Sequence, residues 1–195
     1  MTDWKNLSYV VVDVEGNGHQ PPDLVELAAV PVVDGTIGEP TSWLVQPDQP
    51  ITHFARKIHG ISNEQVVDAP VFGLVEADVL KALDASALIA HNAHVDVGVL
   101  QRKLGGWECP EVFDTLKLAR RLLPGRDSYK LGSLVREFDL ASGLDDDFRD
   151  LQPHRATYDV LVTARLFVHL ADRRTLDELR DQPSGGGRDE EPALF

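Results

Sequence analysis

Apolar residues along the chain fall into two kinds of segment that alternate with each other. Short apolar runs are typical of buried strands, whereas apolar positions spaced by three or four residues are typical of amphipathic helices. The runs that predict strands lie at residues 9–14, 24–33, 42–45 and 87–90. The segments that predict helices lie at residues 95–104, 115–123, 130–138 and 156–170.

Turn and capping residues mark the connections between these segments. Asp34-Gly35 favours a hairpin turn, so we expect the second and third predicted strands to form an antiparallel meander that follows the first. Ser62 followed by Gln65 is a capping box that predicts a short helix, and Pro70 suits the first turn of another. Strands that come first and then alternate with helices predict an α/β domain with a mixed sheet.

The length of the chain suits one domain followed by a short tail. The sequence has 195 residues, and we place the domain at residues 1–180. Pro183 and the glycines at 185–187 lower the tendency to form helix or to pack, so we expect residues 181–195 to be a flexible tail. The single cysteine, Cys109, excludes a disulfide framework and a thiolate zinc cluster.

Charge and hydropathy narrow the class of protein further. A formal charge of −13 argues against a protein whose whole surface grips polyanions. It does not exclude a nuclease that has a locally basic groove or that meets phosphate through metal ions. Glu26 interrupts the best candidate for a membrane span, and the N-terminus lacks a basic region followed by an apolar core. We therefore expect a cytoplasmic protein without membrane association.

Two acidic residues end the first predicted strand. Side chains alternate along a strand, so Asp13 and Glu15 project from the same face, which Tyr9 and Val11 make apolar. Two carboxylates in such a setting are costly to desolvate and repel each other, and a divalent cation would compensate both effects. The alternative is that both acids lie beyond the sheet edge in a solvated turn.

Three further polar residues lie near the starts of predicted helices. Asp96 and Asp159 each lie on or beside the apolar side of a helix, although the helix dipole also favours an acid in a first turn. Pro153 favours a break that brings His154 close to Asp159, and a solvated or structural histidine is the alternative. The four acids and the histidine together suit two-metal phosphodiester chemistry.

The sequence resembles the DEDDh class of 3′–5′ exonucleases, in the DnaQ-like superfamily that includes proofreading subunits of bacterial replicative polymerases. The resemblance covers about residues 8–170 and rests on the motifs VVVDVEGNG, HNAHVDVGVL and HRATYD. It implies an RNase H-like fold with a central mixed five-stranded sheet flanked by helices. It also implies that two Mg²⁺ or Mn²⁺ ions are held by Asp13, Glu15, Asp96 and Asp159, with His154 as general base.

The resemblance also implies contacts to the substrate. Gly16 and Asn17 stand where many relatives have two threonines, so backbone N–H groups would replace hydroxyls at the terminal nucleotide. Asn92 and His59 would also touch the substrate, although Asn92 also suits a helix cap and His59 also suits a turn. Asp114 is expected to cap a helix and not to bind a metal ion.

Six basic residues with a single acid among them lie between positions 117 and 136. We interpret them either as a guide for the nucleic-acid backbone or as the solvated faces of two helices. The basic residues are Lys117, Arg120, Arg121, Arg126, Lys130 and Arg136.

These features predict a metal-dependent 3′–5′ exonuclease that releases nucleoside 5′-monophosphates from single-stranded or frayed DNA 3′ ends. One alternative is an exoribonuclease acting on short RNA or RNA 3′ ends. Another is a catalytically silent nucleic-acid or polymerase-binding module on the same fold. The segment 191–195, EPALF, is similar to peptides that bind bacterial sliding clamps, with an idle tail as the alternative.

Overall fold

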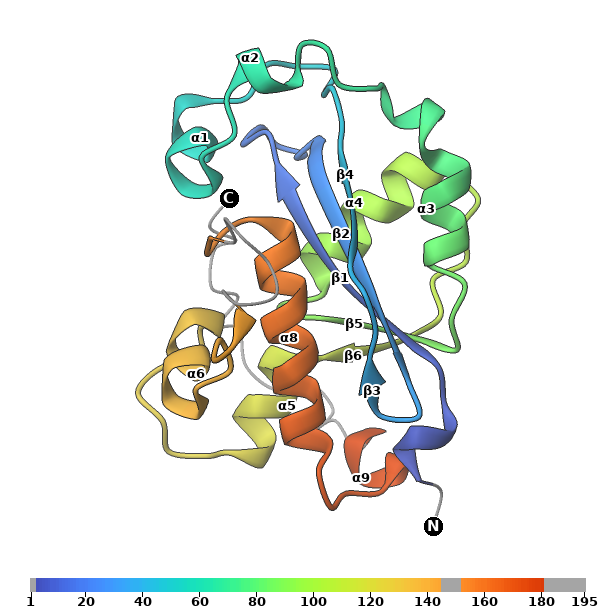
Figure 1. Ribbon diagram of the computed structural model, residues 1–195, viewed down its shortest axis with the longest axis vertical. Coiled ribbons are helices and arrows are strands. Elements are labelled where there is room, and N and C mark those ends of the chain that lie inside the picture. Colours follow the sequence, from blue (N-terminus) through green and yellow to red (C-terminus); the bar gives the residue numbers. More distant parts are fainter. Residues whose placement is uncertain (1–2, 145–151, 181–195) are drawn as a thin grey trace.

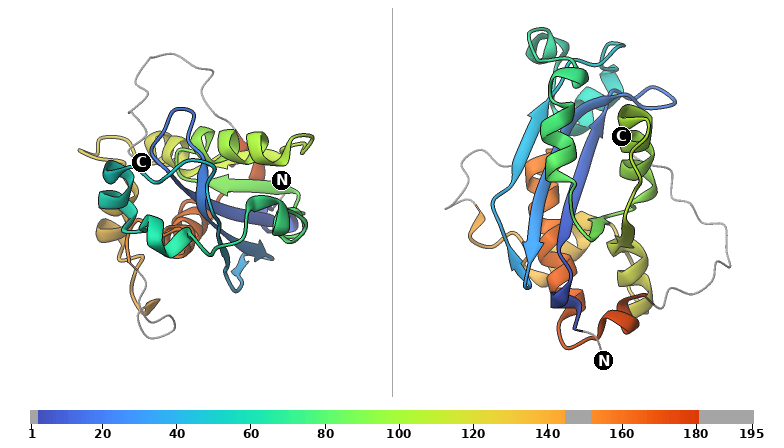
Figure 2. Two further views of the ribbon diagram at one scale, coloured as in Figure 1. Left: turned by 90° about the horizontal axis from the view of Figure 1, so that it is seen from above. Right: turned by 90° about the vertical axis from the view of Figure 1, so that its right-hand side faces the viewer.

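The computed structural model describes residues 3–144 and 152–180, which form a twisted mixed sheet with helices on both faces (Figures 1 and 2). The order across the sheet is β3-β2-β1-β5-β6, and β4 also pairs with β2. The central strand β1 pairs antiparallel with β2 and parallel with β5. The strands are β1 (Tyr9–Gly16), β2 (Leu24–Val33), β3 (Thr36–Ile37), β4 (Thr41–Leu44), β5 (Ala87–Ala90) and β6 (Glu111–Asp114).

The sheet has six strands, where five were expected, because its outer strand is divided. Both β3 and β4 run antiparallel to β2, and they pair with opposite ends of it. Gly38 lies between them and donates its N–H to the Pro31 carbonyl, 2.9 Å away. A Cβ atom at Gly38 would lie 2.9 Å from the Pro31 ring, so the chain leaves the regular ladder at this point.

The four helices predicted from apolar periodicity are present, and their ends lie within one or two residues of the predicted bounds. The capping box at Ser62 and Gln65 is present. Pro70 does not begin a helix as expected, because its carbonyl accepts the Gln46 N–H and holds the segment extended. The α-helices are α1 (His53–His59), α2 (Asn63–Val66), α3 (Glu76–Ala82), α4 (His94–Leu104), α5 (Thr115–Leu122), α6 (Leu131–Phe138), α8 (Ala156–Ala171) and α9 (Leu176–Arg180).

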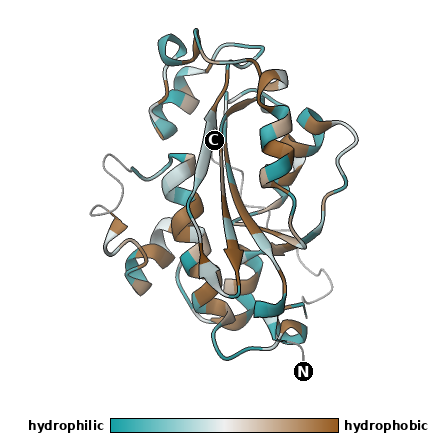
Figure 3. Cartoon of the chain, turned by 45° about the vertical axis from the view of Figure 1, so that its right-hand side comes forward, coloured by the Kyte–Doolittle hydropathy of each residue, from teal (hydrophilic) through white to brown (hydrophobic). Residues whose placement is uncertain are grey.

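The sheet carries a separate apolar layer on each face (Figure 3). Tyr9 and Val11 of β1 belong to the layer that α5, α6 and α8 cover, whereas Val10 and Val12 belong to the layer beneath α3 and α4. This alternation places the next odd-numbered residues of β1 on the α8 side. Towards its end, the apolar α8-facing side of β1 therefore becomes acidic.

An aromatic cluster holds the C-terminal half of α8 against the sheet. The Phe167 ring packs edge-on against Trp4, with centroids 5.6 Å apart, and lies 5.1 Å from Tyr9 and 5.8 Å from Phe113. Aromatic pairs at such separations add to the free energy gained by burying the rings. The cluster thereby fixes the orientation of α8, whose first turn then faces the end of β1 (Figure 1).

Several expectations fall on residues that the structure does not describe. They are the expectations for the tail at 181–195 and for its clamp-like end at 191–195. Within the described ranges, no helix is both long enough and apolar enough to cross a bilayer.

We predict that Phe167→Ala lowers the free energy of unfolding by about 3–5 kcal/mol, because it empties the centre of the aromatic cluster. Phe54→Ala removes the same ring from a side chain that is 57% exposed, and should change the free energy by less than about 0.5 kcal/mol. Urea unfolding of both variants measures the difference. Equal losses would contradict the central role of Phe167.

Candidate active site

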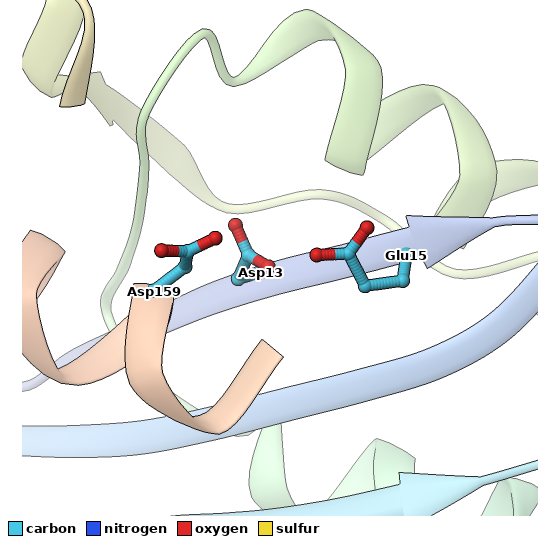
Figure 4. Close-up of side chains that lie close together, drawn as sticks. All are labelled: Asp13, Glu15 and Asp159. Atoms are coloured by element: carbon cyan, nitrogen blue, oxygen red, sulfur yellow. The ribbon is translucent and has the colours of Figure 1, made fainter. Parts of the chain in front are cut away.

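Three carboxylates point toward one another where β1 ends beside the first turn of α8 (Figure 4). Asp13 and Glu15 come from alternate positions of β1, and Asp159 comes from α8. One oxygen from each lies within 4.8 Å of the others. That spacing allows a single cation to contact all three side chains, and oxygen donors suit hard divalent cations.

Burial and mutual repulsion make these carboxylates reluctant to ionise. Loss of solvation raises the pKa of Asp13 and of Glu15 well above the usual range, and the charge of Asp159 raises both further. Burial also raises the pKa of Asp159, to about 7. A bound divalent cation would remove this penalty, because it stabilises the ionised form of every group in the cluster.

Asp96 lies beside the cluster but outside the set of three. It belongs to the first turn of α4 and is only 5% exposed. Burial raises the pKa of Asp96 to about 8, and the charges of Asp114 and Asp159 add to the rise. Hydrogen bonds with the backbone at Asp96 and Val14 act in the opposite direction and lower it. Asp96 is therefore within electrostatic reach of Asp159, at the strand that carries the other two acids.

Asp114 fixes the start of α4 relative to the end of β6. Its carboxylate is buried and accepts hydrogen bonds from four backbone N–H groups, which confirms the expectation that it caps α5. The donors are Asn92, Ala93, Leu116 and Lys117, at 3.1, 3.2, 2.9 and 3.3 Å. The carboxylate therefore joins the second motif to α5 and holds the helix that carries Asp96.

Asn92 does not cap α4 as its position in the sequence also suggested. The helix begins after Ala93, which makes no side-chain capping bond. Asn92 instead adopts a left-handed backbone conformation, with φ of 67°, and its N–H is held by Asp114. Its side chain is half-buried beside the start of α4.

His154 lies in the loop before α8, as the preceding proline predicted. It has a positive φ of 63°, and its N–H donates to the Asp159 carboxylate at 3.1 Å. His154 is exposed, so its ring is accessible to solvent beside the cluster. The backbone bond ties the position of His154 to a carboxylate of the cluster.

Most polar groups of Asn17, in the loop after β1, already form hydrogen bonds within the protein. Asn17 is fully buried, and its amide donates to the Gln49 carbonyl at 3.2 Å. Its side-chain oxygen accepts the N–H groups of His19 and Asp23 at 3.2 and 3.0 Å, and its own N–H donates to the Asp23 carbonyl. The expected contact of Asn17 with substrate would break these bonds, so Asn17 is a positioning residue of the loop.

His59 supports the same loop from α1. It is 3% exposed, and its Nδ1 accepts the Ile61 N–H at 3.0 Å, which leaves the proton on Nε2. Nε2 then donates to the Gly16 carbonyl at 3.3 Å. Burial lowers the pKa of His59, so the ring is neutral at pH 7 and holds the backbone at the end of β1.

A buried ion pair at the cluster was not predicted from the sequence. Glu26 stands opposite Glu15 in the β1–β2 register, is 4% exposed and pairs with Arg155. Glu26 was interpreted only as an interruption of an apolar run, and its partner lies 129 residues away. The available signal was an acid at an inward-facing position of a strand that is otherwise apolar.

Two arginines of the basic stretch are engaged in contacts within the fold. Arg121 donates to the Leu179 carbonyl at 3.0 Å, and Arg126 forms an ion pair with Glu137 at 3.0 Å. Arg121 thus contacts α9, which follows the C-terminal end of α8, whereas Asp159 lies in the first turn of α8. These two arginines are thus occupied within the fold and do not form a solvated helix face, and a role of the stretch in guiding nucleic acid stays a prediction.

Comparisons with known proteins agree on one kind of enzyme. The RNase_T family model, described as Exonuclease, matches residues 10–167. The chain is 35% identical over 182 residues to the 3′-5′ exonuclease DinG of Bacillus subtilis (strain 168), covering 90% of this chain and 18% of that protein. It is 37% identical over 160 residues to Exodeoxyribonuclease 10 of Escherichia coli (strain K12), covering 82% of this chain and 67% of the relative.

A solved structure shares both fold and sequence with this chain. Exonuclease X in complex with 5′ overhanging duplex DNA superimposes with a TM-score of 0.69 and 35% identity, covering 83% of this chain and 90% of that one. The likeness confirms the expected RNase H-like α/β architecture. The chain spans less than a fifth of the length of DinG, so DinG contains much that this chain does not match.

The raised pKa values predict that the metal-free protein loses stability as pH rises from 6.5 to 8.5. Unfolded carboxyls are ionised throughout this interval, whereas Asp96 and Asp159 still release protons from the folded state. The folded state therefore binds more protons, and the free energy of unfolding should fall by at least about 1.4 kcal/mol. Urea unfolding in the presence of a chelator measures this fall.

Mn²⁺ should offset most of this loss, and Asp159→Asn should make the pH dependence shallower. Asp84→Asn changes an exposed acid on the other side of the sheet and should leave the slope unchanged. A stability that does not change with pH over this interval would show that the folded acids titrate normally.

Proposed function

This chain belongs to the exonuclease family, as its resemblance to DnaQ-like enzymes indicated, and we propose that it is a divalent-metal-dependent 3′–5′ exonuclease acting on DNA. The observation that carries the proposal is the convergence of Asp13, Glu15 and Asp159 within 4.8 Å. Structural packing alone gives no reason to gather three repelling acids, one buried and two half-buried, at one point. Phosphodiester hydrolysis at bound cations does give one.

The donor set fits hard divalent cations such as Mg²⁺ or Mn²⁺. All the groups are carboxylates, which such ions prefer, and their raised pKa values show that the fold leaves their charges uncompensated. Asp13, Glu15 and Asp159 would hold two ions, and Asp96 would complete the set from α4. When bound, a pair of such ions activates water and stabilises the leaving oxygen of the phosphodiester.

His154 would act as the general base. A neutral imidazole can take a proton from an attacking water near pH 7. The ring of His154 is open to solvent, and the backbone bond to Asp159 keeps it next to the cluster. The proton would pass to the imidazole, and the hydroxide formed would attack the phosphorus of the terminal phosphodiester and break its bond to the 3′ oxygen of the shortened strand. That oxygen would leave and take up a proton from solvent, and the terminal nucleotide would leave as a nucleoside 5′-monophosphate.

The loop around Gly16 and the turn at Asn92 flank the acids and would contact the terminal nucleotide. Gly16 ends β1, and Asn92 precedes the helix that carries Asp96. DNA is the proposed substrate, because Exonuclease X, 35% identical over most of its chain, was solved with duplex DNA. Single-stranded or frayed 3′ ends suit the site, since they free the terminal nucleotide from its partner.

We predict that the purified protein with Mg²⁺ or Mn²⁺ shortens a 5′-labelled DNA oligomer from its 3′ end. Asp13→Asn should lower kcat at least about 100-fold, because the lost ligand stabilises charge in the transition state. Asp84→Asn is the matched control and should keep wild-type activity. Activity that survives Asp13→Asn would contradict the proposed site, and faster cleavage of an RNA oligomer would contradict the preference for DNA.

His154→Ala should lower kcat by about 10²- to 10⁴-fold without weakening Mn²⁺ binding, because it removes the base and leaves the carboxylates in place. Calorimetric titration with Mn²⁺ separates the two effects. His169→Ala changes an exposed histidine near the other end of α8 and serves as the control. A wild-type kcat in His154→Ala would assign the base to another group.

A further inference from the structure

We infer that the ion pair between Glu26 and Arg155 is a positioning device that holds His154 and the start of α8 in their reactive placement. The inference rests on the proposed function, because it assigns the pair a role in the same reaction. Arg155 directly follows His154 in the chain, and Glu26 stands beside Glu15 in the sheet. The pair thus lies between the general base and the carboxylate cluster.

The ion pair is bidentate, and a backbone N–H group adds a third hydrogen bond to the same carboxylate. Arg155 donates from Nη2 to Oε1 at 2.6 Å and from Nε to Oε2 at 3.0 Å. The backbone N–H of Ala156 also donates to Oε2, at 3.0 Å. Two consecutive residues at the start of α8 are therefore fastened to one buried carboxylate of β2. Such bidentate contacts fix orientation as well as distance.

These bonds occupy both oxygens of Glu26, which distinguishes it from the neighbouring acids. Asp13, Glu15 and Asp159 gather their oxygens around a common point, and Glu26 is outside that set. Glu26 also carries its own counter-charge in the guanidinium of Arg155. Its chemistry is that of an anchor for α8 and not that of a further metal ligand.

The loop before α8 needs such an anchor. His154 has a φ of 63°, and a left-handed conformation is unfavourable for a residue with a side chain. Its N–H bond to Asp159 and the turn bond from Arg155 N–H to the Gln152 carbonyl are local. Among the hydrogen bonds of residues 152–156, those to Glu26 are the ones that connect the loop to the sheet. They therefore set the distance of the loop from Asp13 and Glu15.

A second ion pair in the chain provides a matched control. Arg180 forms the same fork with Glu111, at 2.7 Å for both bonds. That pair joins α9 to the edge strand β6, and both partners are partly exposed. The two pairs share chemistry and geometry and differ in their place relative to the carboxylates.

The test compares Glu26→Gln, Arg155→Gln and the double variant with Glu111→Gln and Arg180→Gln on a DNA oligomer. Each change at the first pair should lower kcat about 100-fold with KM within about twofold, since small misplacement of a reacting group has that effect. The double variant should be no worse than the poorer single variant, because both changes remove one interaction, and it leaves no unpaired charge. Both control variants should retain kcat within about twofold.

Three results would overturn the inference. A raised KM with an unchanged kcat in Arg155→Gln would make Arg155 a substrate contact. Losses that multiply in the double variant would show that the residues act separately. A kcat loss matched by the control variants would show a general effect of lost ion pairs. Arg155→Lys, which keeps the charge but not the fork, should recover at least tenfold of the kcat lost in Arg155→Gln.

Hydrogen exchange tests the anchor without any catalysis. In the metal-free protein, amides of residues 152–160 should exchange at least about tenfold faster in Glu26→Gln than in the wild type, with core amides unchanged. Glu111→Gln should leave this segment as it is. Unchanged exchange would overturn the inference. If the wild type proves inactive on every oligomer, the proposed function fails, whereas the exchange result still decides whether the pair holds the loop.

Discussion

Repulsion between carboxylates that the fold buries together is the constraint on which the rest of this structure depends. Asp13, Glu15 and Asp159 converge although the charge of Asp159 raises the pKa of both other carboxyls. The energy that holds them together comes from elsewhere in the domain, chiefly from apolar layers on both faces of the sheet. The site is thus a strained region supported by a stable frame.

A small number of buried polar contacts connect the apolar core of the domain to the site. Asp114 holds the start of α4, Glu26 holds the start of α8, and His59 holds the backbone where β1 ends. Each is a buried group whose partners include backbone atoms of another element. Such bonds are costly to leave unmade, so they specify the relative position of the elements more sharply than apolar packing does.

The sequence allowed most of this frame to be predicted because apolar periodicity is a local signal. The run at Tyr9–Val14 and the spacing along α8 are each visible within a short window, and Asp13 and Glu15 follow from strand alternation. Asp114 was expected to cap α5, but its bonds to the start of α4 and the contacts of Glu26 and His59 were missed, because their partners are distant in sequence. The α1 helix was also missed, since its sequence, HFARKIH, is largely polar and is fixed by contacts to the loop after β1.

The divided outer strand has a consequence for how separate molecules meet. Regular unpaired edges of a sheet are templates on which strands of other chains can add and begin aggregation. Here β3 has two residues, β4 has four, and the break at Gly38 separates them. At the opposite edge, β6 is equally short and begins with the charged Glu111. Neither edge offers a long, flat ladder for intermolecular growth.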